Sequence, residues 1–401
     1  MICYAFSLSG LGFNNGSGTI HPMWRIASRL PLLILSILSF VGGSRAWAQE
    51  YPLARRGPQF GNYFGEKILD PYRWLEDVDS PKAAKWIAAE RAFTQAAFAA
   101  MPEREPIRRR LRELWNTPRS GPAFETKEAF CKSNDGTQVS LILTTRKGLK
   151  LDGASPAWLH VHGDSGASLK PEFTANITAW IEMGGVFAQA NVRGGGERGE
   201  EWRLSGTKER KQNAVDDVVA AANFLVAQEY TQKDRLVIDG STSSAMLVAA
   251  ATNQHPDLCA VALPDEGVLD MLRYQTFKGG AEWAPDFGTT DDPASVKYLV
   301  AESPVHNGAF GMRCPAILIT TGDHDERVFP ANSYKYAAAK QAAIRTTPYY
   351  GPVLIRIDTS AGPGGSSDTS PDSRLFETWA DRMGFAAHYM PAGTLSLPKG
   401  P

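Results

Sequence analysis

The stretch LVIDGSTSSAMLVAA, residues 236–250, decides how the fold is interpreted. Residues 236–238 are apolar, as expected of a buried strand, and the small residues from 245 onward favour a helix. Between them, DGSTSS at 239–244 predicts a tight strand-to-helix turn. This order is typical of a nucleophile elbow, in which a G-x-S-x-G turn lifts a Ser hydroxyl above the end of a parallel sheet.

The elbow departs from that pattern at its centre. The central position is Thr242, and of the two flanking glycines only Gly240 is present. An elbow residue adopts an unfavourable backbone conformation, so its neighbours must be small. Ser244 therefore fits less well than Gly, and a β-branched Thr242 is poorly suited to a positive φ. We expect the scaffold of a hydrolase with an altered nucleophile.

Composition excludes some classes of partner. The 401 residues carry 42 Lys plus Arg against 43 Asp plus Glu, so the chain is nearly neutral. This balance gives no electrostatic reason to expect nucleic acid or an anionic membrane as a partner. No motif in the sequence matches a metal site. The glycine loop at 194–196 does not predict a nucleotide site either, because it lacks the lysine of a P-loop. We expect no cofactor.

The first 48 residues are interpreted as a leader, with a signal peptide at 23–48. Residues 23–29 are basic, residues 30–41 are apolar, and 46–48 form an A-x-A cleavage signal. The apolar run is shorter than the roughly 20 residues of a membrane span. We therefore expect an exported chain, periplasmic or secreted, with no membrane attachment after cleavage.

Cleavage would remove Cys3 and leave three cysteines, which are Cys131, Cys259 and Cys314. Their spacing matches no metal motif, and an odd number allows at most one disulfide. We expect each to be a small buried apolar residue.

The remaining chain predicts an N-terminal helical segment (49–117), an α/β domain (118–393) and a short tail (394–401). Helices are expected at 81–101, with Ser80 as N-cap, and at 105–115. Alternating, strand-like sequence at 124–145 is broken by a turn at Asn134–Gly136. Apolar strands then alternate with helices, and they lie at 158–161, 186–192, 236–238, 316–321 and 353–357. This rhythm predicts a mostly parallel sheet with helices on both faces and functional loops at the carboxyl ends of its strands.

Several long strings resemble the prolyl oligopeptidase family of serine peptidases. They are DPYRWLED (70–77), KGLKLDG (147–153), NVRGGGERGEEW (191–202), GTKERKQNAVDD (206–217), DMLRY (270–274) and DHDERVFP (323–330). The resemblance extends from about residue 51 to residue 390 and implies an α/β-hydrolase fold and cleavage after proline in short peptides. It also implies a β-propeller between the helical segment and the hydrolase domain. Here ELWN at 113–116 is followed within about a dozen residues by the next strand, so we expect no propeller.

The resemblance locates the catalytic positions, and two of them are altered. The family's GGSNGG elbow aligns with 240–245, which places Thr242 at the nucleophile. The family's AGHG loop aligns with 361–364, which places Pro363 at the histidine, while the acid is retained as Asp325. The oxyanion positions fall on His162 and Ser243. A hydroxyl without a positioned base is a weak nucleophile, so we expect impaired catalysis.

The substrate pocket looks better preserved. By the same resemblance, Trp283 would stack on a substrate proline, Arg327 would bind the substrate backbone, and Val268, Phe287 and Val328 would form the pocket wall. Two of these residues also have a purely structural interpretation. Trp283 would be a core residue, and Arg327 would be an ion-pair partner of Asp325 or Glu326. A short proline-containing peptide is the expected ligand. Self-association through the face that a propeller would cover is a further expectation.

Three hypotheses remain open at this point. The chain is an inactive or binding member of the family, or an active peptidase or esterase, or an engineered or mis-assembled sequence. An active enzyme would use Thr242, or Ser241 or Ser243 after a register shift, with His162 or water as base. The other histidines are expected elsewhere: His160 packed in a strand, His324 in a loop, and His306 and His388 at the surface. A histidine nitrogen within reach of an elbow hydroxyl would favour the enzyme.

Overall fold

The computed structural model describes residues 50–115, 124–163, 174–308, 314–344, 351–359 and 371–397. Contacts divide the chain into two units, Met1–Ala46 and Trp47–Pro401, and every described residue belongs to the second. The predicted leader and Pro363 therefore lie outside the described residues. Across the described ranges, no helix combines the length and apolarity needed to span a membrane.

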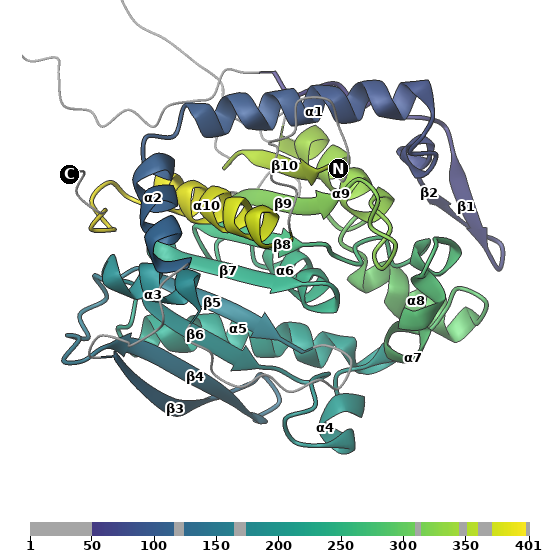
Figure 1. Ribbon diagram of the computed structural model, residues 1–401. Coiled ribbons are helices and arrows are strands. Elements are labelled where there is room, and N and C mark those ends of the chain that lie inside the picture. Colours follow the sequence, from purple (N-terminus) through teal and green to yellow (C-terminus); the bar gives the residue numbers. More distant parts are fainter. Residues whose placement is uncertain are drawn as a thin grey trace, which may run out of the picture. The chain divides into compact units, whose positions relative to one another are not determined.

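An eight-stranded sheet forms the centre of this unit (Figure 1). Its strands are β3 (Phe124–Lys132), β4 (Gln138–Arg146), β5 (Ala157–His162), β6 (Val186–Asn191), β7 (Leu236–Ser241), β8 (Val261–Asp265), β9 (Ala316–Gly322) and β10 (Val353–Asp358). They are ordered β10-β9-β8-β7-β5-β6-β4-β3, and only β4 runs antiparallel to its neighbours β3 and β6. The inner strands are buried along almost their whole length, which explains their continuous apolar sequence. The predicted mostly parallel α/β fold is confirmed.

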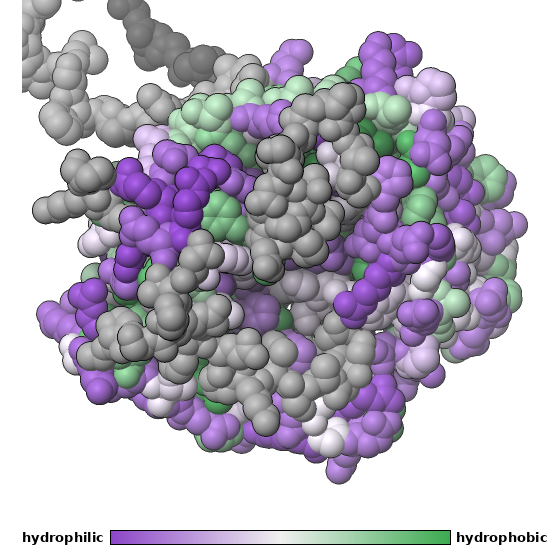
Figure 2. All heavy atoms as spheres, viewed as in Figure 1, coloured by the Kyte–Doolittle hydropathy of each residue, from purple (hydrophilic) through white to green (hydrophobic). Residues whose placement is uncertain are grey.

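Helices cover both faces of the sheet, and a small hairpin precedes them. The hairpin is β1 (Phe60–Tyr63) with β2 (Glu66–Leu69), and the helices are α1 (Pro81–Ala99), α2 (Arg104–Trp115), α3 (Ala175–Glu182), α4 (Glu200–Leu204), α5 (Lys211–Ala227), α6 (Ser243–Gln254), α7 (Ala284–Phe287), α8 (Pro293–Glu302), α9 (Ala331–Ile344) and α10 (Pro371–Tyr389). One core cluster joins the sheet to α5, α6 and α9. A second joins its other face to α2, α3 and α10. The face in Figure 2 is of mixed polarity, with weakly apolar residues along α1 at the top.

The predicted helix start and turn are confirmed at positions where one residue type favours the local backbone conformation. Ser80 caps α1, because its side chain accepts a hydrogen bond from the Ala83 N–H, and Pro81 occupies the first turn. The turn between β3 and β4 is closed by Gly136, whose φ of 85° favours glycine. The sequence analysis named neither β8 nor the helices α8 and α9. Alanine and mixed polar positions in these segments leave a weak periodic signal.

A buried lysine attaches the N-terminal segment to the α/β domain. The Lys335 ammonium, on α9, lies 2.8 Å from a carboxylate oxygen of Asp70, 2.8 Å from Glu76 and 2.5 Å from Asp270. We call these four residues the Lys335 cluster. The Lys335 side chain has no exposed surface. Burial alone would lower the pKa of Lys335, but the three carboxylates outweigh burial and raise the pKa above its usual value.

Replacement of Lys335 tests how strongly this cluster holds the segment. Lys335→Met should lower the free energy of unfolding by about 3–5 kcal/mol, because three carboxylates would lose a common buried counter-ion. Urea denaturation followed by circular dichroism measures the change. Lys297→Met, at an exposed position of α8, is the matched control and should change the free energy of unfolding by less than about 0.5 kcal/mol. A loss as small as that of the control would show that the cluster contributes no net stability.

Candidate active site

The predicted elbow is present at the carboxyl end of β7. Thr242 joins β7 to α6 with φ 59° and ψ −113°, a conformation that a β-branched residue seldom adopts. Its N–H donates to the Asp265 carbonyl at 2.9 Å, and its own carbonyl accepts from the Val268 N–H at 3.3 Å. These two bonds join the elbow to the loop after β8. The turn therefore keeps the geometry of a nucleophile elbow although its central residue is Thr.

The small residues around Thr242 have distinct roles. A Cβ atom on Gly240 would lie 2.8 Å from the Ser244 carbonyl oxygen, so glycine is required there. Ser244, which replaces the second glycine, is buried, and its Oγ accepts a hydrogen bond from the Gly163 N–H at 3.1 Å. The hydroxyl thus occupies a backbone donor in the turn after β5. A glycine at 244 would leave that donor, which directly follows the predicted oxyanion position His162, without this side-chain acceptor.

His162 and Ser243, the predicted oxyanion positions, lie at the end of β5 and the start of α6. The His162 Nε2 atom is 3.4 Å from a Glu197 carboxylate oxygen, and both side chains are only about one-tenth exposed, at 10% and 11%. His162 was also the preferred substitute base. Its ion-pair partner is Glu197, in the loop between β6 and α4.

The other described imidazoles also pair away from the elbow. His160 Nδ1 lies 3.0 Å from Asp239, and His324 Nδ1 lies 2.7 Å from Asp323. His306 Nδ1 lies 2.8 Å from the Ser303 hydroxyl, and His388 Nδ1 lies 2.9 Å from Glu103. Among the hydrogen bonds between described residues, none joins an imidazole to Ser241 or Thr242.

Two histidine predictions need correction. His306 and His388 were expected at the surface, but their side chains are only 11% and 14% exposed. Each is held against a segment distant in sequence, His306 near Asp270 of the Lys335 cluster and His388 against Glu103. His160 is a strand residue as predicted, and His324 is 70% exposed in its loop.

The acid position lies on the loop between β9 and α9. One Asp325 carboxylate oxygen accepts two backbone hydrogen bonds, from Arg327 at 2.8 Å and Val328 at 2.9 Å. The loop therefore fixes the orientation of its own carboxylate. The position aligned with the catalytic histidine, Pro363, lies in the undescribed range 360–370.

The predicted pocket residues come together partly. Trp283 and Arg327 meet: the guanidinium lies 5.3 Å from the indole ring, and the indole N–H points to the Arg327 carbonyl at 3.5 Å. Val268 is bonded to the elbow through its backbone. Phe287 has no exposed surface and packs edge-on against Tyr274, so it lies in the interior. Trp283 is 6% exposed, with Arg327 over its ring.

A network of buried charges lies below the elbow and was missed by the sequence analysis. Arg382 of α10 donates to Asp239 at 2.6 Å and to Asp265 at 2.9 Å. Asp239 also accepts from the Trp158 indole N–H at 2.8 Å. Burial pushes the pKa of Asp239 up, yet His160 and Arg382 outweigh it and hold the pKa below its usual value. The network fixes the ends of β7 and β8, between which the elbow turns.

Glu266 is a second residue that the sequence did not single out. It follows β8 in the left-handed region, with φ 46°, and its N–H donates to the Thr320 carbonyl at 2.9 Å. Glu266 is an exposed residue, but partial burial of its carboxyl raises the pKa of Glu266 to about 7, and the nearby carboxylates of Asp265 and Asp325 act in the same direction. A carboxyl that titrates near neutrality, close to the acid position, is typical of functional sites.

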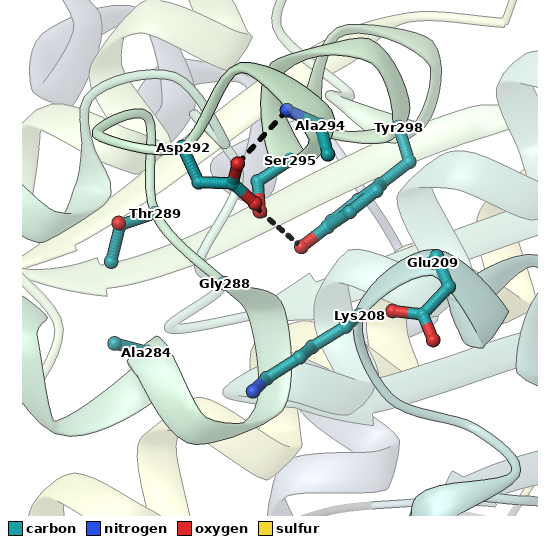
Figure 3. A pocket seen from close by; sticks show the side chains of 9 residues that line it. All are labelled: Lys208, Glu209, Ala284, Gly288, Thr289, Asp292, Ala294, Ser295 and Tyr298. Atoms are coloured by element: carbon teal, nitrogen blue, oxygen red, sulfur yellow. Dashed lines mark hydrogen bonds between the residues drawn. The ribbon is translucent and has the colours of Figure 1, made fainter.

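The predicted site residues coincide neither with the acidic group described next nor with the cavity beside α8. Among the described residues, one acidic group has metal-like spacing, Asp70 with Glu76 and Asp270, and the Lys335 ammonium already occupies its centre. A cavity of about 460 Å³ lies beside α8, and Figure 3 shows the side chains that line it. It is lined by Lys208, Glu209, Ala284, Gly288, Thr289, Asp292, Ala294, Ser295 and Tyr298. No predicted site residue lines this cavity.

Comparison with known proteins gives consistent matches. Residues 171–389 match the profile of the prolyl oligopeptidase family, and residues 51–160 match that of its N-terminal beta-propeller domain. The prolyl endopeptidase of Elizabethkingia miricola is 41% identical over 271 residues, which is 67% of this chain and 37% of that protein. Prolyl oligopeptidase A of Galerina marginata is 38% identical over 268 residues, covering 66% and 35%. The chain thus spans little more than a third of these relatives.

Solved structures agree. Prolyl oligopeptidase B of Galerina marginata, bound to a 35mer hydrolysis and macrocyclization substrate, has a TM-score of 0.63 at 34% identity and covers 69% of this chain and 38% of that one. A post-proline cleaving enzyme from Rickettsia typhi has a TM-score of 0.60 at 27% identity and covers 69% and 38%.

The propeller profile match bears on one expectation. Within 51–160 the described residues form the β1–β2 hairpin, helices α1 and α2, and strands β3, β4 and β5. The three strands belong to the central sheet. The match means that the expected lack of a propeller is not confirmed and stays a prediction.

Glu266 generates a prediction about pH. Because the folded-state pKa lies above the ordinary carboxyl value, the folded state loses stability as pH rises from about 4.5 to about 7. Glu266→Gln removes this loss. Solvent screens the carboxyl, so the stability change that the pKa shift implies is reduced. The free energy of unfolding of the variant should then be about 1 kcal/mol higher than that of the parent at pH 8, and the two should be equal at pH 4.

Urea titrations at both pH values provide the measurement. Glu128→Gln, at an exposed position of β3, is the control and should leave the pH dependence unchanged. If the Glu266→Gln and parent curves kept a constant separation across this pH range, the raised pKa would be ruled out.

Proposed function

Because this chain belongs to the prolyl oligopeptidase family, we propose that it is an α/β-hydrolase-fold member with an impaired hydrolytic centre and a retained proline-preferring cleft. The observation that carries the proposal is the elbow itself. Thr242 has the backbone conformation expected of a nucleophile at an elbow. Within the described part of the chain, however, no hydrogen bond links an imidazole to Thr242. Without a positioned base, its hydroxyl is a weak nucleophile. Pro363, in the aligned histidine position, has no side-chain base.

The cleft part of the proposal is supported by the acid loop and its neighbours. Asp325 is held by two backbone donors, and Arg327 of the same loop lies over Trp283. A flat indole suits a proline ring, and a guanidinium suits a carbonyl or carboxylate oxygen. For a proline to stack on Trp283, Arg327 would have to leave the ring and turn to the peptide. A short proline-containing peptide is the proposed ligand.

A second candidate is an active peptidase or esterase with a substitute base. The intact elbow backbone and the oriented Asp325 favour it, and the relatives are named prolyl endopeptidases and prolyl oligopeptidases. Besides His162 or water, Glu266 is a group whose pKa of about 7 suits a general base. Loss of triad members usually leaves only a small residual rate, so this candidate requires measurable activity in the parent chain.

The domain organisation is part of the proposal. Only residues 116–123 separate α2 from β3, which is far too short for a propeller, so we propose that none lies between them. The proposed boundaries remain 49–117 for the helical segment and 118–393 for the hydrolase domain. Several large apolar side chains in and beside the β1–β2 hairpin are exposed, and they support self-association: Leu53, Phe60, Phe64 and Leu69.

Activity with a fluorogenic Gly-Pro peptide separates the two candidates. We expect the parent chain to be silent and a Thr242→Ser, Pro363→His double variant to hydrolyse the peptide, because Asp325 and the cleft would then serve a complete triad. Activity in the parent that disappears in Thr242→Ala would establish the second candidate. Glu266→Gln and His162→Gln in that active parent would identify the base. Silence in both parent and double variant would contradict a retained cleft.

Export is proposed from the sequence alone, with cleavage after Ala48. Expression of the full reading frame in a Gram-negative host, followed by fractionation and N-terminal sequencing, should give a periplasmic chain that begins at Gln49. A cytoplasmic chain that keeps residues 23–48 would contradict export. Light scattering on the same mature chain tests self-association, for which a mass above that of one chain is expected.

A further inference from the structure

Two of the cysteines lie just upstream of neighbouring strands. Cys259 comes two residues before Val261, the first residue of β8, and Cys314 comes two residues before Ala316, the first residue of β9. Val261 and Ala316 are register partners in the parallel pair. The pairing continues upstream of the strands, because the Ala316 N–H donates to the Ala260 carbonyl at 2.9 Å.

Continued two residues upstream, this register would set the Cys259 and Cys314 backbones at disulfide distance. Neighbouring strands lie about 4.8 Å apart, and disulfide-bonded cysteines have Cα atoms about 4.4–6.8 Å apart. Residues that face each other across such a pair fall within that range.

The two side chains also share one environment. Cys259 and Cys314 are each 6% exposed and belong to the same core cluster, which lies against α5, α6 and α9. Burial raises the pKa of both thiols, and the neighbouring Cys314 raises the pKa of Cys259 further. An effect of Cys314 on the pKa of Cys259 agrees with the closeness of the two positions that the register indicates. The raised pKa values also mean that both thiols are protonated in the folded, reduced chain and exchange slowly with disulfides.

We propose that Cys259 and Cys314 form a disulfide when the chain folds in the presence of a low-molecular-weight disulfide such as oxidised glutathione. One cysteine thiolate attacks the glutathione disulfide and releases one glutathione thiolate, giving a mixed disulfide. The second cysteine then attacks the protein sulfur of that mixed disulfide and releases the second glutathione. Two cysteine thiols are oxidised, one glutathione disulfide is reduced to two thiols, and the two protons pass to the released thiolates. Once folded, the bridge is shielded by its burial.

The disulfide would link the two ends of the segment 259–314, which contains several of the proposed pocket residues. The chain between the two cysteines includes Val268, Trp283 and Phe287. A crosslink that closes a long loop mainly restricts the unfolded chain, so it stabilises the folded state. The inference is independent of hydrolysis, because neither cysteine is one of the proposed site residues.

Refolding of the full chain tests the proposal. The chain is unfolded with reductant, refolded in a glutathione redox buffer, alkylated and digested without reduction. Mass spectrometry should find the tryptic peptide of Cys259 linked to that of Cys314. Thiol titration in denaturant should fall from the four cysteines of the sequence to two, leaving Cys3 and Cys131. Four remaining thiols, or a link through Cys3 or Cys131, would overturn the proposal.

Thermal unfolding gives an independent readout with matched controls. Oxidised refolding should raise Tm by roughly 5 °C in the parent and equally in Cys131→Ala. Cys259→Ala and Cys314→Ala should show no dependence of Tm on oxidation. If either alanine variant fails to fold, the peptide map of the parent and the Cys131→Ala comparison still decide the outcome. A parent Tm that does not respond to oxidation would also contradict the proposal.

Discussion

The backbone at Thr242 is the constraint on which the site depends. With φ at 59°, the chain reverses direction within one residue, between the end of β7 and the first turn of α6. That reversal requires glycine at 240 and draws the loop after β8 against it through two backbone hydrogen bonds. The end of β8 and this loop hold Asp265, Glu266 and Val268, so the geometry of the elbow is linked to the positions of these residues. The Thr side chain changes the chemistry at this point but leaves the turn intact.

Buried charges hold the parts of the unit in place around this turn. Arg382 joins Asp239 and Asp265 beneath the strand ends, and the Lys335 cluster joins the N-terminal segment to α9. Each is surrounded by opposite charges, which is the condition under which buried ions are tolerated. In the Lys335 cluster, Arg73 also pairs with Asp70 and Arg273 with Glu76, so the charges are close to balance. The apolar clusters fix the layers, and these ion pairs fix how the connecting segments attach to them.

The sequence predicted those features that depend on local pattern. Apolar runs predicted the inner strands, and Ser80 predicted the start of α1. The spacing of glycine and hydroxyl residues predicted the elbow. The positions of His306 and His388 were predicted wrongly, because their partners lie far away in the chain. Glu266 and Arg382 had no local signal either, since the pKa of Glu266 depends on carboxylates from three different segments and Arg382 on two strand ends. Pattern reveals which residues face inward, but it does not reveal which charged groups meet there.

The link between Arg382 and Asp239 has a consequence for biosynthesis. The two residues are 143 positions apart, and Lys335 is 265 positions from Asp70. While the chain emerges from the ribosome, β7 and the N-terminal segment are therefore exposed before their counter-ions have been made. Folding of domains usually proceeds from the N-terminus during synthesis, and contacts of long sequence separation form slowly. The ion pairs that fix the strand ends beside the elbow thus form only after α10 has been made.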